Sequence, residues 1–278
     1  MGWPGGLRHV DARLIIDVGV HQGEDTQFYL QKGFFVLGIE ANPSLYESVQ
    51  RSLSKYIDEG RLTLVNVAVS AADGEVTFYR NLRVTDWGTT SAEWADRNER
   101  LYAGSEKITV PGLRFEKILE RYGVPYYLKV DIEGADLLCI HALRQFKDRP
   151  KYVSIESTKT SWEGLVEEFQ LLQDLGYRRF KVVPQHRVQD QVCPSPAREG
   201  EYISHQFCHG ASGTFGEEAP GTWAGASEAI GIYERIFRQY RWFGDDGRVR
   251  SIVRQNRILK KLERFVPKSG WYDTHAAL

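Results

Sequence analysis

The stretch that most constrains the fold of this 278-residue chain covers residues 14–43. Residues 14–18 form a short apolar run, which predicts a strand buried on both faces of a parallel sheet. Residues 24–32 predict a helix, and residues 35–39 predict a second strand. Strand, turn, helix and strand in this order form the unit with which α/β proteins hold the adenosine part of a cofactor.

Two glycines, Gly19 and Gly23, frame the turn between the first strand and the helix. Glycine allows positive φ where a chain reverses tightly, and it lets the backbone approach a ligand because it has no side chain. Glu40 follows the second strand, where a carboxylate can accept hydrogen bonds from both hydroxyls of a ribose. Asn42 and Pro43 predict the N-cap and the first residue of a second helix.

The spacing of the glycines distinguishes two kinds of nucleotide site. A dinucleotide fingerprint has the pattern G-x-G-x-x-G. This chain has the spacing G-x-x-x-G instead, with Asp17 before the first glycine. With an acid after the second strand, this is the pattern of class I S-adenosylmethionine (SAM) methyltransferases. A glycine turn in another doubly wound protein, such as an NAD-dependent oxidoreductase, is the alternative.

Beyond this stretch, predicted strands and helices alternate as far as residue 183. The further predicted strands cover residues 62–69, 75–79, 108–110, 127–132, 150–156 and 177–183, and the further predicted helices cover residues 43–59, 115–122, 135–146 and 163–175. This alternation implies right-handed crossovers and a mostly parallel sheet. Residues 202–208 are predicted to return antiparallel and to complete a seven-stranded sheet.

The length suits one α/β domain with an extension. We predict a SAM-binding Rossmann-like domain of the class I methyltransferase fold over residues 1–210, with helices on both faces of the sheet. A C-terminal loop and helical extension follows over residues 211–278, where Ile230, Tyr233 and Phe237 have helical spacing. Residues 80–106 are expected to be an irregular lid or binding loop, because so long an irregular segment in a compact domain usually has a function.

Composition argues against several classes of protein. The formal net charge of −1 provides no global field for nucleic acid or a membrane surface. No apolar stretch approaches the roughly 20 residues of a membrane span, and the first residues lack a signal-peptide core. Three scattered cysteines predict reduced thiols. A cytoplasmic protein is therefore expected, without nucleic-acid partners or a membrane span.

The tail is strongly basic, with eleven basic and three acidic residues from Arg235 to Lys268. We interpret it as a solvated surface or a contact between subunits of a homo-oligomer. A clamp for an acidic or phosphorylated substrate is the alternative. The spacing of Cys193, His205, Cys208 and His209 matches no zinc-ligand pattern.

Residues 127–136 are the second informative stretch. Lys129, Asp131 and Glu133 alternate along and just beyond a predicted central strand, so their side chains start from the same side of the sheet. Burying ionisable groups in a central strand is costly, so these three indicate the functional edge of the sheet. The next predicted strand ends with Glu156, which we expect to join the cluster.

Several roles fit this cluster. A carboxylate with a raised pKa can take the proton from a hydroxyl that attacks a methyl group. If a metal such as Mg²⁺ is used, Asp131, Glu133 and Glu156 are its predicted ligands. Alternatively, Lys129 and Asp131 pair with each other and only position the cofactor. His21, in the glycine turn, is a further catalytic candidate, although histidines in turns usually form hydrogen bonds or caps.

Together, these stretches resemble the FkbM family of SAM-dependent methyltransferases. The resemblance covers residues 14–183 and rests on four motifs, IDVGVHQGEDT (residues 16–26), IEANP (39–43), NVAVS (66–70) and LKVDIEGAD (128–136). Val20 stands where the family usually has alanine, and Asp136 where it usually has glutamate. Neither departure removes a functional group.

The resemblance implies a domain that binds SAM and methylates a hydroxyl group, commonly on a sugar or a polyketide-type natural product. It places the methionine part of SAM near Asp17, Gly19, His21 and Gly23, the ribose at Glu40, the adenine near Ala68, and the reaction centre at Asp131 and Glu133. Thr26 and Asn42, in the same motifs, complete the predicted cofactor site. We expect residues 80–106 and the chain beyond 185 to select the acceptor, a hydroxylated small molecule. A binding or scaffold protein that retains this fold is the non-enzymatic alternative.

Overall fold

A computed structural model describes residues 11–83, 88–100, 104–158, 161–243 and 270–278. The strands are β1 (Asp11–Val18), β2 (Phe35–Ile39), β3 (Leu62–Val65), β4 (Ala68–Val69), β5 (Gly74–Asn81), β6 (Ser105–Leu113), β7 (Pro125–Val130), β8 (Tyr152–Glu156), β9 (Arg179–Pro184) and β10 (Tyr272–Ala277). The helices are α1 (Glu24–Gln31), α2 (Pro43–Ser52), α3 (Ser54–Asp58), α4 (Ala92–Arg100), α5 (Phe115–Tyr122), α6 (Asp136–Ala142), α7 (Trp162–Asp174) and α8 (Ala226–Phe243). Short 3₁₀ segments are η1 (Leu143–Gln145), η2 (Gln185–Asp190) and η3 (Gly216–Glu218).

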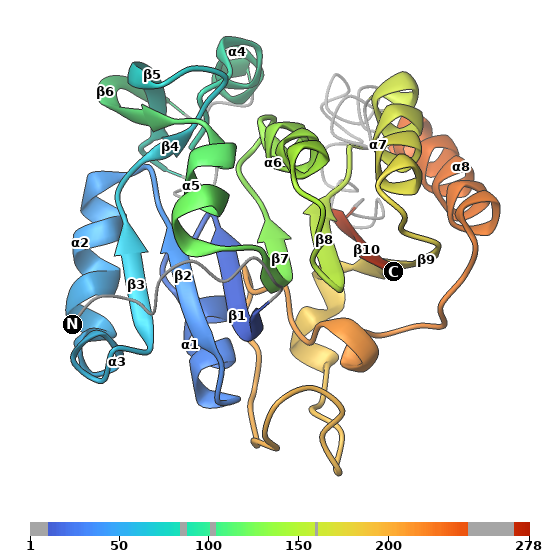
Figure 1. Cartoon of the computed structure of the whole chain (residues 1–278). Coiled ribbons are helices and arrows are strands. Elements are labelled where there is room, and N and C mark those ends of the chain that lie inside the picture. Colours follow the sequence, from blue (N-terminus) through green and yellow to red (C-terminus); the bar gives the residue numbers. More distant parts are fainter. Residues whose placement is uncertain (1–10, 84–87, 101–103, 159–160, 244–269) are drawn as a thin grey trace, which may run out of the picture.

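The strands form two sheets, as Figure 1 shows. The large sheet has seven strands in the order β3-β2-β1-β7-β8-β10-β9, and the small sheet has three in the order β4-β6-β5. In the large sheet β10 runs antiparallel to both neighbours, and the other paired strands are parallel. The predicted class I fold, with a seven-stranded and mostly parallel sheet, is confirmed.

Alternate side chains of the central strands pack into two cores. Ile16, Leu128 and Ile155 point to the face covered by α5 to α8. Ile15 and Tyr127 point to the opposite face, where they pack with α1, α2 and parts of residues 185–223. We name residues 185–223 the covering segment. This segment runs along the lower part of the molecule in Figure 1 and contains only η2 and η3 as regular structure. An irregular segment therefore covers part of this face in place of a helix.

The predicted seventh strand is wrong. Residues 202–208 form no strand, and β10 (Tyr272–Ala277) instead fills the position between β8 and β9. The apolar residues of 202–208 serve another contact, since Phe207 packs edge-on against Phe28 of α1 with ring centroids 4.8 Å apart. The strand that does complete the sheet belongs to the predicted C-terminal extension. The division of the chain at residue 210 stays a prediction.

Three other predicted elements differ from the structure. The helix predicted over residues 43–59 breaks at Leu53, whose buried side chain packs beside Gly23. The strand predicted over residues 62–69 is interrupted at Asn66, because the side-chain amide donates to the carbonyl of Glu40 at 2.7 Å. The segment 80–106 is not irregular throughout, because it includes α4 and the ends of β5 and β6, while residues 84–87 and 101–103 lie outside the described residues.

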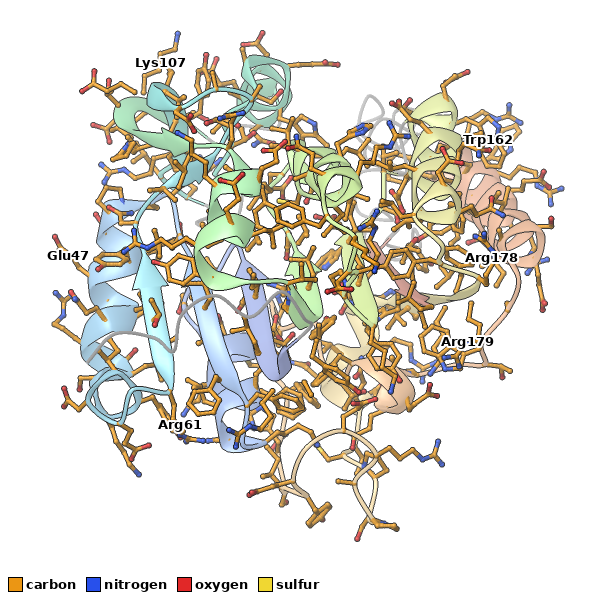
Figure 2. The ribbon with its side chains drawn as sticks, viewed as in Figure 1. Glu47, Arg61, Lys107, Trp162, Arg178 and Arg179 are labelled. Carbon is orange, nitrogen blue, oxygen red and sulfur yellow. The ribbon has the colours of Figure 1, made fainter. Side chains whose placement is uncertain are left out.

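Helix α8 confirms the predicted helical part of the tail. Trp162 of α7, labelled in Figure 2, packs edge-on against Phe237 of α8 with ring centroids 5.3 Å apart. Most of the basic tail lies in residues 244–269, outside the described residues. None of the helices in the described part of the chain has the length and apolar character that crossing a membrane requires.

A buried hydrogen-bond network fixes β10 to its neighbours. Ser157 donates to Oε1 of Glu168 at 2.6 Å, and the hydroxyls of Ser157 and Tyr233 both hydrogen-bond Thr274 of β10. Burial raises the pKa of Glu168 to about 8, although the hydroxyl contacts act in the opposite direction. Glu168 is therefore a neutral acid in the folded protein at pH 7.

This pKa predicts how stability changes with pH. Between pH 4.5 and about 8 the folded state keeps the Glu168 proton that the unfolded state loses, so stability falls as pH rises. The limiting slope for one proton is about 1.4 kcal/mol per pH unit. We expect E168Q to remove this contribution, and urea unfolding from pH 5 to 8 measures it. The exposed neighbour supplies the control E167Q, and parallel pH profiles for wild type and E168Q would contradict the assignment.

Candidate functional site

The glycine turn after β1 has the predicted backbone geometry. Gly19 and Gly23 have φ values of 90° and 88°. The N–H of Gly19 donates to the carbonyl of Ile39 at 3.0 Å, which joins the ends of β1 and β2. A Cβ atom on Gly19 would lie 1.9 Å from the carbonyl oxygen of Asp131. The first glycine is therefore required where the loop after β7 crosses the turn.

The loop after β7 is held in place from both ends. The N–H of Asp131 donates to the carbonyl of Val18 at 2.9 Å. The carboxylate of Asp136 accepts from the N–H groups of Ile132 and Gly134 at 3.0 and 2.9 Å. Burial raises the pKa of Asp136 to about 6. Sequence reasoning noted Asp136 only as a departure from the family and missed this role.

Glu133 does not continue the predicted alternation of side chains. Its φ of 51° is in the left-handed region, so the extended geometry has already ended at this residue. The hydroxyl of Thr89 donates to the carbonyl of Glu133 at 2.6 Å. A Cβ on Gly134 would lie 2.4 Å from the ring of Trp94, so α4 and the chain before it pack closely on this loop.

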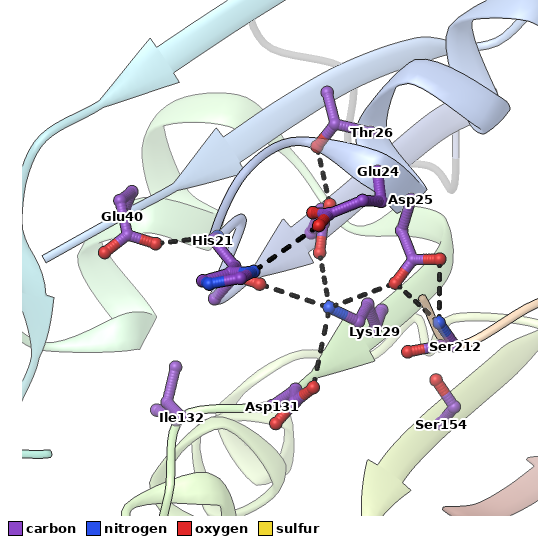
Figure 3. A network of polar contacts seen from close by, with 12 residues as sticks. His21, Glu24, Asp25, Thr26, Glu40, Lys129, Asp131, Ile132, Ser154 and Ser212 are labelled. Carbon is purple, nitrogen blue, oxygen red and sulfur yellow. Dashed lines mark hydrogen bonds and ion pairs between the residues drawn. The ribbon is translucent and has the colours of Figure 1, made fainter. Parts of the chain in front are cut away.

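Lys129 is the centre of the site shown in Figure 3. Its Nζ lies 3.2 Å from Asp17 Oδ1, 3.4 Å from Asp25 Oδ2 and 3.8 Å from Asp131 Oδ2. It also donates to the carbonyl of Gly19 at 3.1 Å. Lys129, Asp17 and Asp25 are all buried, whereas the side chain of Asp131 is 39% exposed. One ammonium group thus joins β1, α1 and the loop after β7.

The ionisation of this cluster follows from burial and mutual attraction. Burial alone lowers the pKa of Lys129, but Asp17, Asp25 and Asp131 raise it well above its usual value. Burial raises the pKa of Asp17 to about 6, with Lys129 opposing that shift. Lys129 is therefore a permanent cation that favours ionised carboxylates around it.

Two further contacts hold the acids of the cluster. The hydroxyl of Thr26 donates to Asp17 Oδ2 at 2.6 Å. The N–H of Ser212, in the covering segment, donates to both carboxylate oxygens of Asp25 at 2.9 and 3.0 Å. Asp25 was expected only near the start of the helix, so its role as an ion-pair partner was missed. The only sequence signal was its position two residues after Gly23.

Glu40 directly follows β2, as predicted, and its side chain is buried. Its Oε2 accepts from the N–H of His21 at 2.9 Å, and its Oε1 accepts from the N–H of Asn42 at 2.8 Å. Burial raises the pKa of Glu40, while these two hydrogen bonds act against the rise. Each carboxylate oxygen has a second lone pair, so Glu40 can still accept from two neighbouring hydroxyls.

The remaining predicted cofactor residues lie around the same turn or beyond β3. His21 Nδ1 lies 3.6 Å from Glu24 Oε1. The side-chain oxygen of Asn42 accepts from the N–H of Ser44 at 3.1 Å, which confirms the predicted N-cap of α2. Ala68 is buried in β4 of the small sheet.

A carboxyl group that sequence reasoning missed lies at the same edge of the large sheet. Asp273 of β10 is the register partner of Glu156, and the residue before Glu156 is the partner of Val130 in β7. Asp273 is 6% exposed, and within the described residues its side chain makes no hydrogen bond or ion pair. Burial raises its pKa well above the usual value. The polar sequence of β10 gave no alternating apolar pattern from which to find it.

The structure brings together most of the predicted site residues, but not the predicted metal ligands. Asp17, Gly19, Lys129 and Asp131 are in direct contact, and Glu40 binds the turn at His21. Among the described residues, no three His, Cys, Asp or Glu side chains are grouped to hold a metal ion. Asp131, Glu133 and Glu156, the predicted ligands, are therefore not grouped in this way. The roles of individual residues stay predictions.

The chain matches a known protein family. A family profile described as "Methyltransferase FkbM domain" matches residues 17–179, more than half of the chain. No curated protein matches.

The chain also resembles solved structures at low identity. A SAM-dependent methyltransferase from Archaeoglobus fulgidus is 14% identical, with 96% of this chain and 86% of that chain covered and a TM-score of 0.37. One from Geobacter sulfurreducens, in complex with S-adenosyl-L-homocysteine, is 10% identical, with 97% and 86% covered and a TM-score of 0.37. Precorrin-6y C5,15-methyltransferase from Geobacter metallireducens is 16% identical, with 64% and 70% covered and a TM-score of 0.36.

The contact between Gly19 and the loop after β7 gives a testable prediction. G19A should destabilise the protein by at least about 2 kcal/mol through the clash with the Asp131 carbonyl, in addition to the strain of positive φ. G210A is the matched control, since Gly210 has φ 99° and a Cβ atom added there would meet no atom within 4 Å. Chemical denaturation measures both variants, and equal losses would show that the crossing is not tight.

Proposed function

The chain belongs to the FkbM methyltransferase family, and we propose that it transfers a methyl group from SAM to a hydroxyl group of a small molecule. The observation that carries this proposal is the cluster around Lys129, at the point where the sheet order reverses between β1 and β7. Open α/β sheets bind ligands at this reversal. The acceptor is proposed to be a sugar or a natural-product intermediate, as the family resemblance implies.

The charge of the site supports SAM over a dinucleotide. Asp17, Asp25 and Asp131 surround Lys129, and Glu40 lies beyond the same turn at His21, so carboxylates outnumber cations. SAM carries a sulfonium and an ammonium group, whereas NAD brings a pyrophosphate that these acids would repel. The absence of the third fingerprint glycine points the same way.

The chain offers a distinct group for each part of SAM. Glu40 accepts hydrogen bonds from the two ribose hydroxyls with its remaining lone pairs. The carboxylate of Asp131, which is more exposed than the other acids of the cluster, pairs with the ammonium group of SAM. Asp17 and Lys129 hold Asp131 and the Gly19 turn in place. Ala68 and its neighbours border the adenine. His21, Thr26 and Asn42 act here by holding other groups in place. The N–H of His21 binds Glu40, the hydroxyl of Thr26 binds Asp17, and the side chain of Asn42 caps α2.

Methyl transfer requires the acceptor oxygen and the methyl group to be aligned, and most of the rate enhancement comes from that alignment. The oxygen–carbon bond forms as the carbon–sulfur bond breaks, and the hydroxyl proton must leave. Lys129 favours the ionised form of Asp131, which suits charge pairing better than proton uptake. Glu133 is therefore the proposed proton acceptor, since burial raises the pKa of Asp273 well above its usual value and favours its neutral form, which has no free carboxylate to take up a proton.

The ribose assignment predicts the behaviour of E40A. Loss of two hydrogen bonds to a carboxylate should weaken SAM binding by about tenfold or more. Isothermal titration calorimetry with SAM measures the dissociation constant. The control is E47A, on the exposed surface of α2 (Figure 2), which should bind SAM as wild type does. An unchanged dissociation constant in E40A would reject the assignment.

The proton-acceptor assignment predicts different effects of two variants. D131N should weaken SAM binding, whereas E133Q should bind SAM normally and lose roughly 100-fold or more in transfer rate. The assay measures S-adenosylhomocysteine release with a panel of sugars and phenols, and mass spectrometry identifies the O-methyl product. A fully active E133Q would reject Glu133 as the proton acceptor, and products methylated only at nitrogen or carbon would reject O-methyl transfer.

A further inference from the structure

A cavity of about 390 Å³ lies away from the proposed SAM site. Lys181 of β9 forms one wall, and Arg198, Glu217, Glu218 and Trp223 of the covering segment form others. Arg179, at the start of the same strand, is labelled in Figure 2. Lys181 and Lys129 lie in one row across the sheet, through Ser154 and His275. Three strand spacings separate them by about 14 Å. We name this cavity the Lys181 pocket.

Lys181 is a buried cation without an acidic partner. It is 4% exposed, and no carboxylate in the described part of the chain forms an ion pair with it. Its ammonium group donates to the carbonyl of Ala219 and lies 4.4 Å from the ring centroid of Trp223. Burial lowers its pKa. Lysines are rarely this buried unless paired. The ammonium group has three N–H donors and gives one to the carbonyl of Ala219, so it retains hydrogen-bonding capacity for an anion.

The acids in the pocket wall are already neutralised by other groups. Glu218 Oε2 lies 3.0 Å from the ammonium group of Lys32. Glu217 pairs with Arg179 at 3.2 Å and accepts from the indole N–H of Trp223 at 2.8 Å. Neither glutamate forms an ion pair with Lys181, although the charge of Glu217 opposes the fall in the pKa of Lys181.

Arg198 adds a second cation to the wall. The residue is exposed, and its guanidinium group makes no ion pair with any described residue. Its backbone N–H donates to Glu218, which fixes this part of the chain beside Lys181. Among the described residues, the pocket thus presents two cations without ion-pair partners beside an apolar wall formed by Val192, Pro194 and Trp223.

We propose that the Lys181 pocket binds a small organic anion, with its carboxylate or phosphate group between Lys181 and Arg198. The volume is in the range of pockets that hold small metabolites. The apolar wall receives the carbon skeleton of the ligand, and the two cations receive its charge. This site is separate from the proposed methyl transfer and does not depend on that function.

Isothermal titration of the full chain with inorganic phosphate and with citrate, at constant ionic strength, tests the proposal. Wild type should show binding of at least one of the two anions at ligand concentrations of up to about 20 mM. R198A should weaken binding about fivefold, as expected for loss of one charge near the surface. R121A removes an exposed arginine on α5 and should bind as wild type does. K181M should weaken binding further, and R198A keeps the test valid if K181M does not fold.

Three results would overturn the proposal. Two of them are the absence of binding of either anion and equal binding by R198A and R121A, and the third is displacement of the anion by SAM. Competition with SAM locates the site independently. Unchanged phosphate or citrate affinity at saturating SAM supports a separate pocket, whereas displacement by SAM would assign the anion to the glycine turn and overturn it.

Discussion

The ion pairs of Lys129 are the interaction on which the rest of the site depends. A buried ammonium group is costly alone, and Asp17, Asp25 and Asp131 offset that cost from three different elements. The same lysine binds the carbonyl of Gly19 and so fixes the turn. The contacts that compensate the charge of Lys129 therefore also determine the geometry of the site. The excess of carboxylates over cations also sets the sign of the ligand group that the site can accept.

The sequence identified the parts of the site that depend on neighbouring residues. The positive φ at Gly19 and Gly23 and the cap at Asn42 follow from local rules, and the structure confirms them. The position of Lys129 and Asp131 together at one edge of the sheet followed from the alternation of side chains along a predicted strand. These features were predictable because each is determined within a few residues or by a regular sheet. What each side chain binds stays a prediction.

Contacts between distant segments could not be read in the same way. Asp25 is held by the backbone of Ser212, and Asp273 reaches the edge of the sheet on a strand without an apolar pattern. Conversely, the apolar residues around Phe207 suggested a strand but pack against Phe28. Burial alone does not reveal the partner of a side chain, so a sequence pattern can show that a residue is buried without showing where.

The position of β10 has a consequence for the folding pathway. β8 and β9 follow each other in sequence, yet both pair with a strand that is synthesised much later. Until β10 docks, each of these strands has an unpaired edge, and closing the gap requires contacts of large sequence separation. Such contacts slow folding, and open edges can recruit other chains. The stage of folding before β10 docks is thus the stage at which these edges are exposed to misassembly.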